Sequence, residues 1–243
     1  MRSLLRTNID VNWKNHKARY HTALHISCDR GHDAVVSLLL AHRPGLHVNK
    51  RNNYGCTPFF LCCLNGHSNS ARLLLRDPRV DLNLPNHYGF TPLRQIALKG
   101  HAEVCKWMVA SGRMMDFGQP GNTRTDPFIA THDEVQEILR RFRDDPEGTR
   151  QQVRIEVGWY EELAAEFFAM VVFLCDGLLE VKEPADSVTG AMAAERRFMG
   201  IARRLPMELQ MVLCHRIVGS GRNNVSGKHS EAAFRNLAIR ASD

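Results

Sequence analysis

Apolar and polar positions recur at a regular interval along the first half of the chain. Three segments, residues 22–32, 57–67 and 91–101, share an opening threonine, a run of mostly apolar residues and a closing Gly-His pair. The threonines are 35 and 34 residues apart, and the Gly-His pairs keep the same two intervals. A bias in composition does not stay in register over such distances, so the pattern indicates an internal repeat.

Each repeat carries the signals of two short helices. Threonine caps the first helix, and Pro58 or Pro92 follows at the first helical position, where a backbone donor would be unpaired anyway. Glycine ends that helix because it adopts the left-handed conformation without steric penalty. The second helix has apolar residues at helical spacing that are expected to face the neighbouring repeat. They are Val35, Val36, Leu38 and Leu39, then Ala71, Leu73 and Leu74, then Val104, Cys105, Trp107 and Met108.

Polar turn residues separate the repeats. Residues 49–56 and 83–90 carry Asn and Gly at turn positions and predict projecting hairpin tips. The first hairpin, residues 12–22, is two residues longer than the next two and lacks their glycine. The pattern of the next two hairpins therefore does not fix the exact shape of the first tip.

These motifs resemble the ankyrin-repeat family, whose TPLHxA, GH, V and LL positions recur with a period near 33 residues. The resemblance implies an all-α solenoid of stacked helix-turn-helix repeats with projecting hairpin tips. We place full repeats near residues 15–51, 52–85 and 86–118. Residues 1–12 are expected to be part of a preceding repeat, and residues 119–142 a shortened repeat that caps the array.

Beyond the repeats the period is lost. Residues 143–150 (RDDPEGTR) predict a polar linker, and residues 151–243 predict a helical C-terminal region. Apolar residues on most faces of 153–181 indicate one long helix that is buried on two sides. Further helices are expected over residues 191–204, 206–218 and 231–240.

The composition is that of a folded protein whose positive charge lies in the repeats. Of 243 residues, 44% are apolar and 24% are charged, and the net charge of +6 divides into +7 before Pro146 and −1 after it. The longest apolar run, Phe167 to Cys175, has nine residues, whereas a membrane helix needs roughly 20. The seven cysteines form no CxxC pair. We expect an intracellular protein, cytoplasmic or nuclear, without a membrane span or disulfide framework.

Two motifs suggest chemistry but have structural explanations. Residues 221–228 resemble a phosphate-binding loop, yet the glycine spacing is one residue too long and His229 replaces the required Ser or Thr. His21 and His25 have the spacing of zinc ligands on a helix, but the Glu of a metalloprotease is missing. The resemblance gives His25 a structural hydrogen bond instead. We therefore expect no enzymatic activity, no cofactor and no metal site.

The cysteines of the repeats are expected to differ in reactivity. Cys28, Cys62 and Cys63 occupy small-residue positions of the first helices, and Cys105 replaces a valine-like residue. Buried thiols of this kind act as compact core residues. Cys56 falls at a hairpin tip and is the thiol that we expect to react readily.

In the ankyrin family, partners lie against the hairpin tips and the exposed ends of the first helices. Mapped by motif, the expected binding residues are Arg51, Asn53, Tyr54, His87, Tyr88 and Phe90 at the tips, and Arg30, Leu64, Asn65, Leu98 and Lys99 on the helices. Exposed aromatic residues and arginines dominate interface energetics. The alternative is that the tyrosines only pack one tip against the next. The expected function is a non-catalytic scaffold that binds a protein partner through the concave surface.

Two other functions are considered. Residues 205–209 (LPMEL), followed by Val212 and Leu213, resemble the opening of an F-box, which implies a substrate adaptor that binds a linker subunit of a ubiquitin ligase. The same residues also suit an ordinary helix start. We expect Leu205, Leu209, Val212 and Leu213 to be buried against the long helix, as in a structural cap. A pI near 9.1 suggests nucleic-acid binding, but the basic residues form no recognisable reading motif.

Overall fold

The repeat signals of the sequence fold into three successive pairs of short helices. In the computed structural model these are α2 (Ala23–Arg30) and α3 (Asp33–Ala41), α4 (Pro58–Asn65) and α5 (Ser68–Leu75), and α6 (Pro92–Lys99) and α7 (Ala102–Ala110). The structure describes residues 10–16, 19–41, 45–129, 132–175, 207–218 and 233. The chain divides into two compact units between Val157 and Gly158. The predicted all-α solenoid is confirmed.

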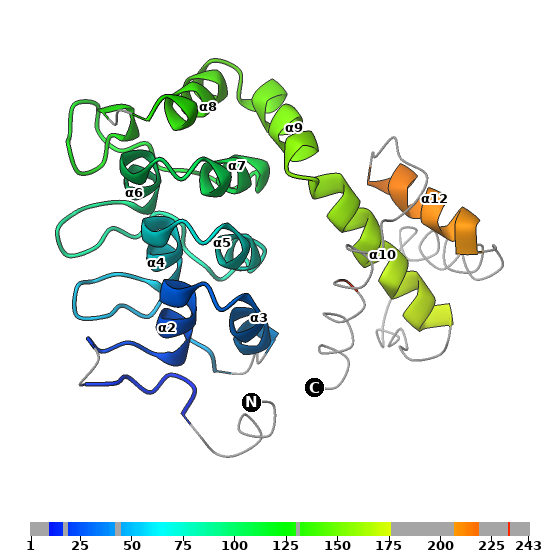
Figure 1. The fold of residues 1–243 in the computed structure, drawn as a ribbon, viewed down its shortest axis with the longest axis horizontal. Helices are drawn as coiled ribbons and strands as arrows, with labels where there is room; N and C mark the ends of the chain where they lie inside the picture. The colour runs from blue at the N-terminus through cyan, green and yellow to red at the C-terminus, as the bar shows by residue number, and fades with distance from the viewer. Residues whose placement is uncertain are drawn as a thin grey trace, which may run out of the picture. The chain divides into compact units, whose positions relative to one another are not determined.

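The helix pairs stack in two columns (Figure 1). The first helices α2, α4 and α6 form one column, the second helices α3, α5 and α7 form the other, and the hairpin tips project from the side of the first helices. Within each column, every helix packs against the next. This stacking buries the apolar side that a single repeat would leave exposed.

The predicted helix ends are confirmed in all three repeats. The hydroxyls of Thr22, Thr57 and Thr91 accept hydrogen bonds from the backbone N–H three residues later. Gly66 ends α4 in the left-handed region, with φ +75°, and its backbone N–H donates to the carbonyl of Cys62. A non-glycine residue would be strained there.

Small and large apolar side chains fill the space between the columns. The large ones that are almost fully buried are Leu24, Leu39, Phe59, Phe60, Leu74, Leu93, Ile96 and Met108. The predicted compact core residues Cys28, Cys62, Cys63 and Cys105 are buried as well. Burial raises the pKa of the Cys105 thiol to about 12, which keeps it protonated and unreactive.

The array closes with a reduced fourth unit. A single 3-10 turn, η1 (Pro127–Ile129), packs on α6 where a first helix would lie. The helix α8 (Asp133–Asp144) then packs on α7 and continues the second column. The buried face of α8 includes Val135 and Leu139, so the column ends on a helix with one apolar and one polar face.

Residues 143–150, predicted as a linker, are helical instead. The helix α8 continues to Asp144, and α9 (Pro146–Glu156) begins two residues later. The carboxylate of Asp145 accepts from the Gly148 N–H at 3.0 Å and caps α9, with the proline at its first position. The helix packs on α7 and α8, and Arg154 Nε donates to the Ala110 carbonyl at 2.8 Å. These tertiary contacts order a segment whose composition is typical of a linker.

The second unit contains α10 (Trp159–Cys175) and α12 (Met207–Ile217), which pack against each other. The single long helix predicted over 153–181 is wrong, because the chain breaks at Gly158, with φ +69°, between α9 and α10. The helix predicted over 206–218 is confirmed by α12. The helices predicted over 191–204 and 231–240 fall outside the described residues, apart from Ala233.

The buried side of α12 differs from the prediction. Leu209 is 51% exposed, whereas Gln210 and Cys214 are buried. Leu213 and Met211 pack against a cluster that Cys214 forms with Phe168 and Val171 of α10. The helix therefore turns a face offset by one residue toward α10. Val212 is half-buried, and Leu205 falls outside the described residues.

None of the described helices is both long and apolar enough to cross a membrane.

Candidate protein-binding surface

An asparagine shapes each of the two regular hairpin tips. Asn52 Oδ1 accepts from the backbone N–H groups of Tyr54 and Cys56, both at 2.9 Å. Asn86 Oδ1 does the same for Tyr88 and Phe90, both at 3.0 Å. The side chain replaces the hydrogen bonds that a tight turn leaves unmade, so each tyrosine is held at the end of a well-defined turn.

The first tip, whose shape the sequence left open, differs in geometry from the other two. Asn15 pairs with His21, six residues away, whereas Asn52 pairs with Cys56, four residues away. Tyr20 donates its N–H to the Asn15 carbonyl, the role that Gly55 has in the second tip. Tyr20 has φ +58° and Arg19 has φ +56°, so two non-glycine residues are held in the left-handed region.

The tips are joined to one another by backbone hydrogen bonds. The Asn53 N–H donates to the Arg19 carbonyl at 3.2 Å, and the His87 N–H donates to the Tyr54 carbonyl at 2.9 Å. The guanidinium of Arg19 also lies 5.6 Å from the centre of the Tyr54 ring. The tips of successive repeats therefore form one continuous surface.

Tyrosines follow one another along this surface. Tyr20, Tyr54 and Tyr88 are 40%, 38% and 58% exposed. Tyr20 was not among the binding residues expected from the sequence, although successive tyrosines of this row are 34 residues apart. In the fourth tip Arg124 takes the place of Tyr54 and Tyr88, because its N–H donates to Asn122 Oδ1 at 3.0 Å. In the first tip the carbonyl of Arg19 accepts from the next tip as that of Tyr54 does, so Arg19 takes this place and Tyr20 follows it at the position of Gly55.

The ends of the first helices continue the surface. Asn65 Nδ2 donates to Asp29 Oδ1 at 3.0 Å, which links α4 to α2. His101 Nε2 and His132 Nε2 donate to the carbonyls of Leu64 and Leu98, at 3.2 and 3.1 Å. The C-terminal ends of α4 and α6 are thus hydrogen-bonded to the following repeat. Leu98 is 41% exposed there.

Most of the residues expected to bind a partner are exposed on this surface, and three are partly buried. The exposed ones are Arg30, Asn53, Tyr54, Asn65, His87, Tyr88, Leu98 and Lys99, and the partly buried ones are Arg51, Leu64 and Phe90. We use the name tip surface for these eight exposed residues together with Arg19, Tyr20 and Arg124.

The partly buried residues support the tips. Arg51 Nε donates to the Gly55 carbonyl at 3.0 Å and Arg51 Nη2 to the Pro85 carbonyl at 2.6 Å, so this arginine links two tips. Leu64 and Phe90 pack against a buried cluster of Cys56, Phe60 and Leu61.

The prediction that Cys56 is exposed and reactive is wrong. Its side chain is buried in the cluster with Phe60 and Leu61, and the residue is 5% exposed. Burial raises the pKa of the Cys56 thiol to about 11. The turn directs the chain back into the repeat at this position, although the neighbouring Tyr54 points into solvent.

His21 and His25 have structural roles. His25 Nε2 donates to the Cys56 carbonyl at 3.1 Å, and its Nδ1 lies 2.8 Å from Thr22 Oγ1. Burial lowers the pKa of His25 to about 4, so the ring is neutral at pH 7. His21 Nε2 accepts from Asn52 Nδ2 at 3.0 Å. The described residues contain no group of three metal-ligating side chains placed to hold an ion, and residues 221–228 fall outside them.

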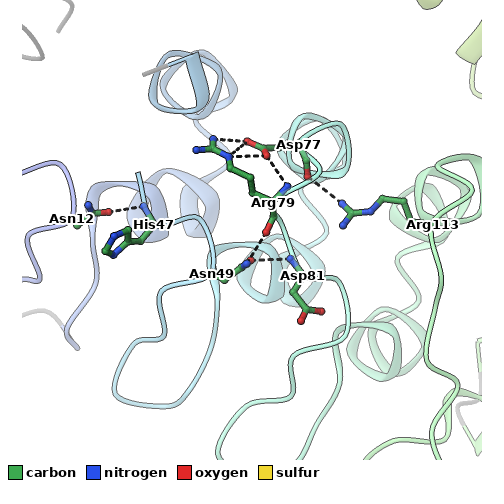
Figure 2. A network of polar contacts seen from close by, with 7 residues as sticks. All are labelled: Asn12, His47, Asn49, Asp77, Arg79, Asp81 and Arg113. Atoms are coloured by element: carbon green, nitrogen blue, oxygen red, sulfur yellow. Dashed lines mark hydrogen bonds and ion pairs between the residues drawn. The ribbon is translucent and has the colours of Figure 1, made fainter. Parts of the chain in front are cut away.

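A second set of asparagines joins the return loops that lead from each second helix to the next tip (Figure 2). Asn49 Nδ2 donates to the Arg79 carbonyl at 2.7 Å, while its Oδ1 accepts from the Asp81 N–H at 2.8 Å. Asn12 and Asn83 make equivalent bonds to the loops that follow them. The recurrence of Asn at positions 12, 49 and 83 is the sequence signal for this network. It holds the tips of successive repeats at a defined spacing.

Comparison with protein families agrees with this architecture. A family model described as ankyrin repeats, three copies, matches residues 1–86 and 48–120. The matched residues include all three helix pairs. The F-box-like residues 205–213 lie outside the match.

Proposed function

Because the N-terminal region of the chain consists of ankyrin repeats, which are protein interaction modules, we propose that this protein is a non-catalytic scaffold. It binds another protein through the tip surface. The observation that carries the proposal is the row of exposed tyrosines, Tyr20, Tyr54 and Tyr88, on adjacent tips. Tyrosine provides a large contact area and has few rotatable bonds, so little entropy is lost when it is held at an interface.

The rigidity of the tips supports the same proposal. The backbone bonds between tips and the asparagine network order this surface before a partner arrives. Preorganisation lowers the entropic cost of binding, so more of the contact energy appears as affinity. Leu98 adds an exposed apolar contact at the end of α6.

Affinity capture with the full chain as bait tests the proposal. We expect partners recovered by the wild-type chain to be lost with the double variant Tyr88→Ala/Leu98→Ala, each anchor contributing about 1–3 kcal/mol. The matched control is Met114→Ala, which truncates a side chain that is 88% exposed on a return loop. Equal recovery by the wild type and the double variant, with unchanged melting, would place the interface elsewhere.

A ubiquitin-ligase adaptor is a second candidate function. It is favoured by the exposure of Met207 and Leu209 at the start of α12, because an F-box needs an accessible helix start to bind its linker subunit. If the chain is such an adaptor, we expect the wild type to co-purify with a ligase linker subunit. Leu209→Ala should then abolish the association without lowering the melting temperature. Retention of the linker by Leu209→Ala would exclude this contact.

A further inference from the structure

Cationic side chains gather on the tip surface and beside it. They are Arg19, Arg30, Arg51, Lys99 and Arg124. Of these, Arg30 pairs with a carboxylate, Asp29, at 3.8 Å. Among the described residues Lys99 and Arg124 have no carboxylate partner. The nearby Asp126 is buried, and its two oxygens accept from the N–H groups of Gly121 and Phe128.

The carboxylates of the array lie mainly elsewhere. Many are on the second helices, on the return loops and on α8: Asp33, Asp77, Asp81, Glu103, Glu134 and Glu137. Several of them neutralise cations there. Asp77 pairs with Arg79 at 2.7 Å, and Glu103 and Glu134 both pair with Lys106, at 3.2 and 3.3 Å. The excess positive charge of the repeats is therefore concentrated on the side of the tips.

Apolar side chains lie among these cations. Ile26 is exposed on α2, one turn before Arg30, and Leu98 is exposed beside Lys99. At the second tip, the Arg19 guanidinium lies over the Tyr54 ring. A surface that alternates cations with aliphatic and aromatic groups matches a ligand in which acidic and apolar groups alternate.

We propose that the partner presents an acidic polypeptide segment with interspersed apolar side chains to the tip surface. This inference rests on the proposed scaffold function and specifies the chemistry of the partner. Opposite charges raise the rate of encounter and disfavour neutral or basic competitors. The aliphatic Ile26 and Leu98 favour a polypeptide over a nucleic acid, because they pack on apolar side chains and gain little from phosphates.

Fluorescence anisotropy of a labelled random copolymer of Glu and Tyr tests the charge. We expect the full-length wild-type chain to bind this probe, to bind a copolymer of Lys and Tyr at least about tenfold more weakly, and to lose affinity as salt is added. The variant Lys99→Glu/Arg124→Glu should bind the acidic copolymer at least about tenfold more weakly. Both side chains are exposed, so the substitutions leave the core intact.

The matched control is Arg140→Glu/Arg141→Glu, which makes the same change in net charge at exposed positions of α8. It should bind the acidic copolymer within about twofold of the wild type. An equal loss in the control would overturn the proposal, since attraction would then follow net charge alone. Absence of wild-type binding at low salt would overturn it as well.

Two further measurements separate the alternatives. Binding of single-stranded oligothymidylate as tight as that of the acidic copolymer, and lost in the same variant, would overturn the proposal in favour of nucleic acid. Captured partners retained by Lys99→Glu/Arg124→Glu but lost by Tyr88→Ala/Leu98→Ala would refute the acidic partner while leaving the scaffold function intact. Loss of the captured partner in both variants supports both the acidic partner and the scaffold function.

Discussion

Replacement of Gly66 by alanine tests how the repeats are joined. Gly66 has φ +75°, and a Cβ atom there would lie 2.6 Å from Nδ1 of His101 in the next repeat. Two costs are therefore expected. The left-handed conformation costs a non-glycine residue about 1–2 kcal/mol. Displacement of the imidazole also breaks the hydrogen bond from His101 Nε2 to the Leu64 carbonyl, which contributes about 1 kcal/mol.

The sum predicts that Gly66→Ala lowers the free energy of unfolding by about 2–3 kcal/mol and the melting temperature by roughly 4–12 °C. The assay is urea and thermal unfolding of the full chain followed by circular dichroism. The matched control is Gly121→Ala, because Gly121 has φ +79° but no atom within 4 Å of the added Cβ. The control isolates the backbone cost, about 1–2 kcal/mol.

A double-mutant cycle with His101→Ala separates the two costs. In that background the added methyl group meets no imidazole, so Gly66→Ala should cost only as much as the Gly121→Ala control. If Gly66→Ala and Gly121→Ala were equally destabilising in the wild-type background, the contact between Gly66 and His101 would contribute nothing. The proposed role of this glycine in repeat packing would then be refuted.

Three other predictions concern groups that lie beneath the tip surface. Cys56, with a thiol pKa of about 11, should react with iodoacetamide at pH 8 far more slowly in the folded chain than in urea, and equal rates would contradict its burial. Phe90→Ala should destabilise the chain by about 2–4 kcal/mol because Phe90 packs on the cluster around Phe60, whereas Tyr88→Ala should leave the melting temperature nearly unchanged. Burial lowers the pKa of His25 to about 4 in the folded chain, from about 6.5 for an unperturbed histidine, so the unfolded chain takes up a proton first as pH falls. Its contribution, about 3 kcal/mol, is present above pH 6.5 and is lost as pH falls toward 4, and His25→Gln should remove this part of the pH dependence of unfolding.

The helix pairs were predictable because their signals are local. Thr57 and Gly66 fix the ends of α4 through bonds within a few residues, and the spacing of these signals reports the repeat directly. The exposure of Tyr54 and Tyr88 followed in the same way, since a tip residue that lies between a turn asparagine and a glycine has few neighbours. Tyr20 obeys the same interval, but its hairpin lacks the glycine that marks the others.

Tertiary contacts decided the features that the sequence did not predict: the helical state of residues 143–150, the burial of Cys56 and the orientation of α12. Residues 143–150 are polar enough for a linker, yet packing of α9 on α7 and α8 makes them helical. Cys56 and Tyr54 are two positions apart on one turn, and only the cluster formed with Phe60 and Phe90 buries the first and leaves the second in solvent. The rotation of α12 that exposes Leu209 depends on which of its faces fits α10.

The sequence by itself determined that this chain contains helical repeats and where their tips lie, because caps and turns depend on neighbouring residues. The separation of charge was decided only by the tertiary structure. Lys99 and Lys106 are seven residues apart, but Lys106 pairs with Glu103 on its own helix and with Glu134, which stacking brings in from α8, whereas Lys99 lies on the side of the tips. The pair with Glu103 is local, but the distance from Lys106 to Glu134 is set by the packing of α8 on α7, and a one-dimensional pattern carries no information about that distance.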